Sequence, residues 1–166
     1  MKLASPASLA DNIPMSSPVI RPALPHEYDE VARVWMESWA STGLAEPSNF
    51  LLANLRARVR KEIDGGWSLF VADDDGCFAA MLALHLPDKY LDQLFVAPQC
   101  QGKGIGRQLL AFTRQQLPDE IWLRCVRENE KAWRWYEREG FVYEKEEVAS
   151  ATGYMMKYYR WKREAV

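Results

Sequence analysis

The sequence predicts a mixed α/β fold in which helices pack on a central sheet. Short runs of β-forming residues alternate with runs that repeat apolar residues at helical spacing, an Asp-Gly turn joins two early strands, and two strands follow one another near the C-terminus. The 166 residues, of which 48% are hydrophobic and 27% charged, suit one domain with a sizeable core. We expect residues 1–18, rich in Ser, Pro and Ala, to form a flexible arm and residues 19–166 to form a single domain.

The N-terminal half predicts a strand, two helices and a hairpin. Pro25 suits the first position of a helix because it lacks an N–H and its φ is already helical. The second helix opens at residues 47–48 and ends at the glycine pair 65–66, with its arginines largely outside its apolar stripe. The predicted elements are strand 19–23, helix 25–39, helix 47–63, strand 67–72 and strand 77–86.

The C-terminal half predicts strands and helices in alternation. Pro98 ends a strand because proline cannot donate to a sheet ladder, and Gly140 suits the end of a helix. The predicted elements are strand 90–96, a helix that follows three closely spaced glycines and ends near residue 116, strand 121–126, helix 129–139, strand 141–146 and strand 154–161.

Charge, cysteines and hydropathy narrow the class of protein. The formal net charge of −2 gives no reason to expect nucleic acid as a partner. Cys77, Cys100 and Cys125 have no C-x-x-C spacing and cannot all pair, so we expect a reducing, cytoplasmic location. We expect no membrane span, because no apolar run approaches the roughly 20 residues that a span needs, and no signal peptide. The run of aspartates at 73–75 precedes Gly76 and predicts a hairpin turn, so we expect no metal site.

The glycine-rich stretch 101–107, QGKGIGR, is the first motif that carries chemistry. A glycine-rich turn that opens a helix presents free N–H groups and the positive end of the helix dipole, which together bind anions. Arg107 and Gln108 stand where a nucleotide-binding P-loop would have Lys and Ser or Thr, and the spacing G-x-G-x-G is not that of a dinucleotide fingerprint. The stretch therefore predicts a phosphate-binding loop of another kind.

The second motif lies on the helix predicted over 129–139. Asn129, Ala132 and Tyr136 are spaced three and four residues apart and so share one face of that helix. Asn129 is also a good N-cap, and Tyr136 taken alone would usually be a core aromatic. These structural interpretations stand beside a ligand-binding one.

Together the two motifs resemble the GNAT superfamily of N-acetyltransferases. Its pyrophosphate loop is matched by Gln101-x-x-Gly104-x-Gly106, and its later motif by N-x-x-A-x-x-x-Y-x-x-x-G-F over 129–141. The preceding 94–98, LFVAP, is similar to the fourth strand of that family. The resemblance implies a mostly antiparallel sheet of six or seven strands with helices on both faces, splayed between strands four and five. It also implies acetyl-CoA as cosubstrate and a homodimer through the late strands.

The family's functional residues carry over to named positions. The resemblance implies that Val96 pairs its backbone with pantetheine, that the Leu94 N–H donates to the acetyl carbonyl oxygen, and that Tyr136 protonates the departing thiolate. The positions expected to bind the cosubstrate are Leu94, Phe95, Val96, Gln101, Gly102, Lys103, Gly104, Ile105, Gly106, Arg107, Asn129, Ala132 and Tyr136.

The base and the acceptor are less closely defined. Alternation along the strand puts Tyr90, Asp92 and Leu94 on one face, so Asp92 is the candidate base, acting through water, or else a binding group for the acceptor's ammonium. Glu37 is a weaker candidate. We expect the acceptor site to use Trp35 and Trp39, the loop 41–43 and residues 154–159. The acceptor is expected to be a small primary amine, with a protein or peptide amine, or a non-catalytic acyl-CoA-binding module, as the alternatives.

Overall fold

The computed structural model describes residues 17–46 and 50–165. The predicted arm lies outside these residues except for 17 and 18, and so does the predicted opening of the second helix at 47–48. The strands are β1 (Val19–Pro22), β2 (Ser68–Asp74), β3 (Cys77–His85), β4 (Tyr90–Val96), β5 (Glu120–Val126), β6 (Val142–Val148) and β7 (Met155–Lys162). The α-helices are α1 (Tyr28–Ala40), α2 (Leu52–Asp64), α3 (Ile105–Gln116) and α4 (Glu130–Arg138), and the 3-10 turns are η1 (Pro25–Glu27), η2 (Leu86–Asp88) and η3 (Pro98–Cys100).

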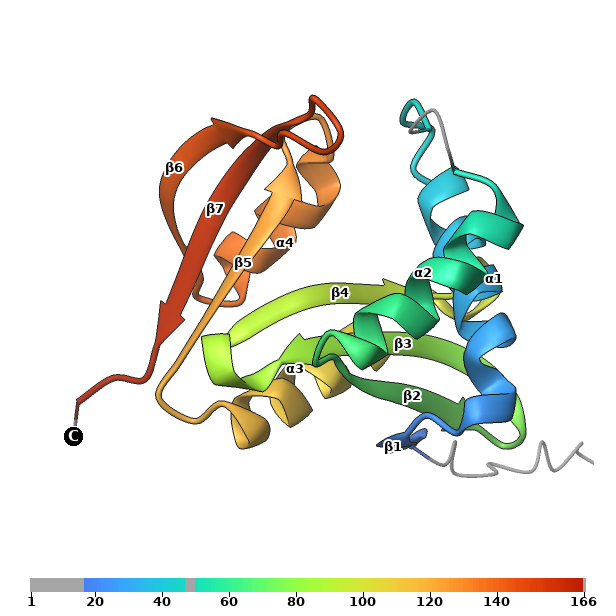
Figure 1. Cartoon of the computed structure of the whole chain (residues 1–166). Helices are drawn as coiled ribbons and strands as arrows, with labels where there is room; N and C mark the ends of the chain where they lie inside the picture. The colour runs from blue at the N-terminus through green and yellow to red at the C-terminus, as the bar shows by residue number, and fades with distance from the viewer. Residues whose placement is uncertain (1–16, 47–49, 166) are drawn as a thin grey trace, which may run out of the picture.

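The seven strands form one sheet in the order β1-β2-β3-β4-β5-β7-β6 (Figure 1). Each neighbouring pair is antiparallel except β4 and β5, which run parallel. The predicted mixed and mostly antiparallel sheet is therefore confirmed. The early hairpin is tight, because Asp75 (φ 54°) and Gly76 (φ 80°) form a two-residue turn whose backbone twist matches the strands. Asp73 Oδ1 accepts a hydrogen bond of 2.7 Å from Gly76 N, so this aspartate serves the turn.

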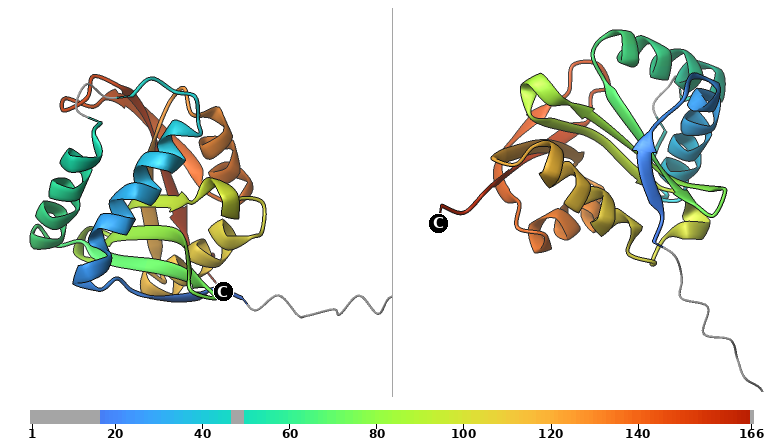
Figure 2. Two further views of the ribbon diagram at one scale, coloured as in Figure 1. Left: turned by 90° about the vertical axis from the view of Figure 1, so that its right-hand side faces the viewer. Right: turned by 90° about the horizontal axis from the view of Figure 1, so that it is seen from below.

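Helices cover both faces of the sheet (Figures 1 and 2). On one face α1 packs against β4, where the Trp35 and Phe95 rings lie 6.2 Å apart. On the other face α3 packs against β2, where the Phe112 and Phe70 rings meet edge to face at 4.8 Å. Among the described residues, no helix combines the length and apolarity needed to cross a membrane.

The sheet opens between β4 and β5. Their pairing holds at Tyr90 and Trp122, and Trp122 N donates to the Lys89 carbonyl at 3.0 Å. Beyond that point the two strands diverge, and β5 turns away with β7 and β6 (Figure 1). This confirms the predicted splay, and it leaves one edge of β4 without a neighbouring strand over most of its length.

Candidate active site

A cleft of about 490 Å³ lies where β4 and β5 diverge, a volume typical of small-molecule sites. One wall comes from α1, α2 and the segment just before α2, and includes Trp35, Trp39 and Phe50. The opposite wall comes from β5 and α4 and includes Tyr136. The fold therefore brings strand β4, which the glycine loop follows in the chain, and Asn129, Ala132 and Tyr136 of the second motif to a single cavity.

The free edge of β4 presents backbone groups to this cleft. Ala97 N donates to the Ala79 carbonyl at 2.8 Å, so Ala97 and Ala79 are a hydrogen-bonded pair of the antiparallel ladder. Because such pairs alternate, the N–H and C=O groups of Val96 and of Leu94 point away from β3 and toward the gap. In this orientation both N–H groups can donate hydrogen bonds to a ligand in the gap.

The Val96 carbonyl is already engaged. It accepts a hydrogen bond of 2.9 Å from Ser38 Oγ of α1 and another of 3.1 Å from Gln101 Nε2. Both of its lone pairs are thereby used, and the N–H remains directed at the cleft. Gln101, expected to bind the cosubstrate, here links the start of the glycine loop to β4.

A bulge in β4 changes which side chains share a face. Leu84 pairs with Leu91 whereas Ala83 pairs with Gln93, so Asp92 is the extra residue. Its carboxylate lies on the α1 side of the sheet and accepts from Trp67 Nε1 at 2.7 Å.

Leu94 lies on the other side of the sheet from Asp92. It precedes Phe95, which packs on Trp35 of α1, and neighbouring residues of a strand point to opposite faces. The prediction that Asp92 and Leu94 share a face is therefore wrong, since a bulge interrupts strict alternation. The expected role of Leu94 depends on its N–H, which lies in the plane of the sheet and is unaffected.

The glycine loop has the backbone of an anion site. Gly102 (φ 79°) and Gly104 (φ 81°) both adopt the left-handed conformation, and a Cβ added at either would meet nothing within 4 Å. The first helical bond of α3 runs from Gln108 N to the Gly104 carbonyl, so the N–H groups just before residue 108 have no partner within the helix. These donors and the open space over the two glycines fit a pyrophosphate.

Gly106 and Ile105 have packing roles that spacing alone does not reveal. A Cβ at Gly106 would lie 3.5 Å from the Trp135 ring, an ordinary van der Waals contact, so α4 packs against α3 at this position. Ile105 is 2% exposed and belongs to the core. The side chain of Arg107, expected near the phosphates, is 72% exposed and pairs with Glu139 at 2.8 Å. Lys103 is exposed beside the loop.

Tyr136 lines the cleft from α4 and is 6% exposed. Burial raises the pKa of its hydroxyl well above the usual range, with smaller contributions from Cys125 and Tyr90. Tyr136 is therefore protonated at physiological pH, as a proton donor must be. Burial also raises the pKa of Cys125, on the same wall, to about 12, so this thiol is no nucleophile.

Asn129 caps a helix and also lies in the wall of the cleft. Its Oδ1 caps α4 by accepting from Ala132 N at 3.4 Å, and both residues line the cleft. Glu37, by contrast, pairs with Arg33 at 2.7 Å and is not part of the cleft lining.

Of the expected acceptor-site residues, Trp35, Trp39, Tyr154 and Met156 line the cleft. The loop 41–43 does not, and Tyr159 is fully buried in the core, where its hydroxyl donates to Glu137.

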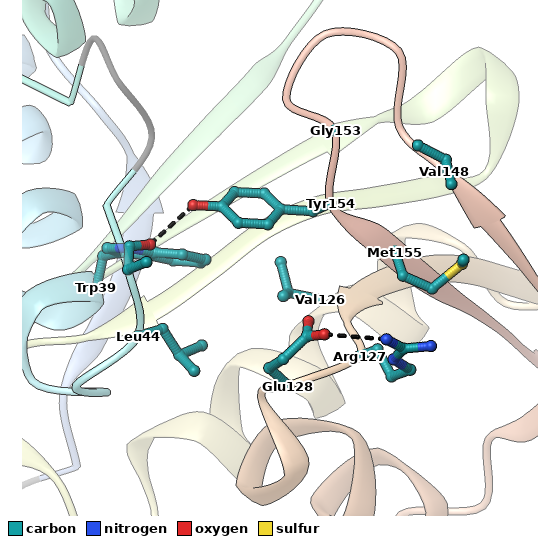
Figure 3. A pocket seen from close by; sticks show the side chains of 10 residues that line it. Trp39, Leu44, Val126, Arg127, Glu128, Val148, Gly153, Tyr154 and Met155 are labelled. Atoms are coloured by element: carbon teal, nitrogen blue, oxygen red, sulfur yellow. Dashed lines mark hydrogen bonds and ion pairs between the residues drawn. The ribbon is translucent and has the colours of Figure 1, made fainter.

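A second cavity of about 400 Å³ adjoins the first (Figure 3). Trp39 and Tyr154 line both cavities. Tyr154 comes from the turn before β7, and its hydroxyl donates to the Ala45 carbonyl at 2.8 Å (Figure 3). The Tyr154 and Trp39 rings are 6.2 Å apart. This bridge joins the loop after α1 to the turn before β7 across the acceptor side of the cleft.

Sequence reasoning missed four residues that the fold brings to the site. Ser38 and Trp67 hold Val96 and Asp92, while Arg58 and Arg124 line the cleft. Arg58 belongs to a helix face whose sequence pattern predicts solvent exposure. Arg124 lies in a strand, where the spacing of a single arginine does not indicate a functional site. A local signal existed for Arg124 alone, since it alternates with the apolar Leu123 and Cys125 and must face away from them.

Comparison with known proteins agrees with this geometry. The family model described as Acetyltransferase (GNAT) family matches residues 28–141, which span both motifs. The chain belongs to the GNAT acetyltransferase family.

Its relatives are distant in sequence. Peptidyl-lysine N-acetyltransferase YiaC of Escherichia coli is 27% identical over 127 residues, which cover 74% of this chain and 82% of YiaC. An acetyltransferase from Thermus thermophilus superposes with a TM-score of 0.72 at 20% identity, over 90% of this chain and 99% of that one. The structure of yncA from Salmonella typhimurium, solved with its cofactor acetyl-CoA, has a TM-score of 0.65 at 16% identity, over 91% and 98%.

Proposed function

We propose that this protein transfers the acetyl group of acetyl-CoA directly to a primary amine of a small molecule, in a ternary complex. The observation that carries the proposal is the free edge of β4, whose Leu94 and Val96 N–H groups point into the gap left by β5, with the glycine loop following the end of this strand. A cosubstrate with a peptide-like arm and a pyrophosphate matches that pair of features. Among the described residues Cys125 is the cysteine that lines the cleft, and its raised pKa keeps the thiol protonated, which favours direct attack by the amine over an acyl-enzyme.

The binding roles follow from the backbone. The Val96 N–H donates to the pantetheine arm, and Ser38 and Gln101 hold the strand in place through the Val96 carbonyl. The N–H groups of the glycine loop bind the pyrophosphate. Bound acetyl-CoA supplies the thioester whose acetyl group is transferred.

Three groups of the chain act on the reaction. The Leu94 N–H donates to the acetyl carbonyl oxygen as negative charge develops on it, a kind of contact worth roughly 2.7–4 kcal/mol in a well-studied protease. The Tyr136 hydroxyl donates to the departing sulfur. Asp92, held by Trp67, takes a proton from the acceptor's ammonium through water, so that the free amine can attack the thioester, or, in its second possible role, binds that ammonium.

The acceptor is a small molecule because the cleft is bridged on its acceptor side. The contact between Tyr154 and Ala45 spans the two loops between which an extended peptide would lie. A protein lysine is the second candidate, and the name of the YiaC relative is the observation in its favour.

Location and assembly complete the proposal. The three cysteines are free thiols, which supports a reducing, cytoplasmic environment. Strand β6 is the exposed edge of the sheet, and it is the surface through which we propose that two copies pair.

The test combines binding with turnover. Thermal unfolding is measured with acetyl-CoA, with CoA and with ATP, and thiol release is then followed with a panel of amines. Stabilisation by acetyl-CoA and CoA but not by ATP, followed by amine-dependent thiol release, is expected. Absence of stabilisation at saturating acetyl-CoA would refute the proposal.

A further inference from the structure

The charged side chains of the cleft form an unusual set for an enzyme that binds an ammonium. Among the described residues, the cleft is lined by one carboxylate, Asp92 of β4, and two guanidiniums, Arg58 of α2 and Arg124 of β5. The lining is therefore net positive. A polycationic acceptor would be repelled by two of these three charges, so the set selects against it.

The carboxylate is not neutralised by either arginine. Asp92 accepts hydrogen bonds from two neutral donors, Trp67 Nε1 at 2.7 Å and Gln93 Nε2 at 3.2 Å. Within the described part of the chain it forms no ion pair. Its negative charge is held in place and remains available to the acceptor's ammonium.

Arg58 is oriented but weakly paired. Its guanidinium lies over the Trp35 ring, 4.8 Å from the centroid, an arrangement that limits its freedom and leaves its N–H edge available. Its ionic partner is Glu62 at 3.5 Å, and the two side chains are 47% and 34% exposed. Exposed pairs of this kind contribute little, so Arg58 can turn toward an anion in the cleft at small cost.

Arg124 stands on the opposite wall. Its Nε donates to the Tyr90 hydroxyl at 3.2 Å, and burial, followed by the charge of Asp92, raises the pKa of Tyr90 above its usual range. The partners of this guanidinium are thus two phenols, Tyr90 and Tyr158, rather than a carboxylate. Both arginines retain a full positive charge with N–H groups to spare.

We propose that the acceptor is a zwitterion: a primary amine whose own molecule carries a carboxylate or phosphate, with the ammonium at Asp92 and the anion at Arg58 and Arg124. The inference rests on the proposed acetyltransferase function and specifies its substrate class. The aromatic side chains of Trp39, Phe50 and Tyr154 line the same cleft and would pack against an apolar body between the two charged ends.

Matched substrate pairs test the charge requirement. Thiol release from acetyl-CoA is measured with phenylalanine against phenylalaninamide, β-alanine against its amide, and phosphoethanolamine against ethanolamine, with spermidine as the polycation. The amine of an amide is less basic than that of the acid, so intrinsic reactivity at neutral pH favours the amide. We expect at least one anionic member to exceed its neutral partner in kcat/KM by about ten- to hundredfold, the loss expected for a missing charged hydrogen bond. Which pair responds distinguishes carboxylate from phosphate.

Variants on one helix test the assignment to Arg58. Arg58→Gln should reduce the acid-to-amide ratio of kcat/KM toward one, mainly through KM, and Arg124→Gln should reduce it in the same direction. Arg60→Gln is the control, because Arg60 is on the same helix but pairs with Asp29 at 3.0 Å and does not line the cleft. It should keep the ratio of the unmodified enzyme.

The outcomes separate this inference from the proposed function. Binding of acetyl-CoA with no anionic amine preferred over its neutral partner, or with spermidine preferred, overturns the inference and leaves the acetyltransferase proposal standing. A preference for the acids that survives in both arginine variants overturns the assignment to these residues. Failure to bind acetyl-CoA at all refutes the proposed function instead.

Discussion

Replacing Gly104 by valine should abolish acetyl-CoA binding at moderate cost to folding. Gly104 has φ 81°, and a Cβ there would meet nothing within 4 Å, so the cost is backbone strain rather than a clash. For a non-glycine residue in the left-handed region that strain is roughly 1–2 kcal/mol. In a chain of this size it lowers the unfolding midpoint by about 2–8 °C. The valine side chain would fill the open space in which the pyrophosphate is expected to lie.

Gly76→Val is the matched control for this strain. Gly76 has φ 80°, its added Cβ would also meet nothing within 4 Å, and it lies in the hairpin between β2 and β3. The two variants should therefore lose similar stability without ligand. They should differ only in their response to acetyl-CoA.

The assay is the ligand-induced shift of the unfolding midpoint. At about 100 times its dissociation constant, acetyl-CoA adds roughly 2.7 kcal/mol, or about 5–11 °C for a chain of this size. If Gly104→Val weakens binding about a hundredfold, the same concentration adds only about 0.4 kcal/mol, or a shift of about 1 °C. Gly76→Val should keep the full shift. Equal shifts in the two variants would show that the glycine loop does not hold the cosubstrate.

Three further predictions concern the acid, an ion pair and the β4 edge. Tyr136→Phe should lower kcat by about a hundredfold or more with acetyl-CoA binding unchanged. Tyr159→Phe is the control, because Tyr159 lies outside the cleft, and it should leave kcat unchanged. Equal kcat values in the two variants would exclude the acid role. Arg21 pairs with Glu27 and lowers the pKa of this carboxyl to about 2. The Glu27 carboxylate therefore stabilises the fold fully above about pH 4.5, and this contribution is lost as the pH falls toward 2. Glu27→Gln should cost about 1–3 kcal/mol at pH 7, and urea unfolding should show this difference disappearing by pH 2; a constant difference would contradict it. Ser38→Ala removes one hydrogen bond to the Val96 carbonyl. It should lower the free energy of unfolding by about 1 kcal/mol and raise KM for acetyl-CoA. An unchanged KM would rule out a positioning role for Ser38.

The features that could be predicted from the sequence are local in origin. Gly102 and Gly104 adopt left-handed φ values because glycine tolerates that backbone conformation. Proline, glycine and the spacing of apolar residues determine where strand β4 and helix α3 begin and end. The capping of α4 by Asn129 is likewise a matter of residues three apart. Because these features depend on neighbours in the chain, the element order and the two motifs could be predicted without a structure.

The features that could not be predicted depend on contacts between segments distant in the chain. The bulge that turns Asp92 toward Trp67 is set by the register of β4 on β3, which alternation along one strand cannot reveal. Ser38 contacts Val96 from a helix 58 positions away, and Arg58 and Arg124 line one cleft because β5 diverges from β4. Side chains with ordinary spacing in sequence acquire a function when the packing of the sheet and helices brings them to one cleft. The charged residues proposed to select the acceptor therefore come together only in the folded protein. The loop proposed to bind the cosubstrate, by contrast, is already indicated by its glycines.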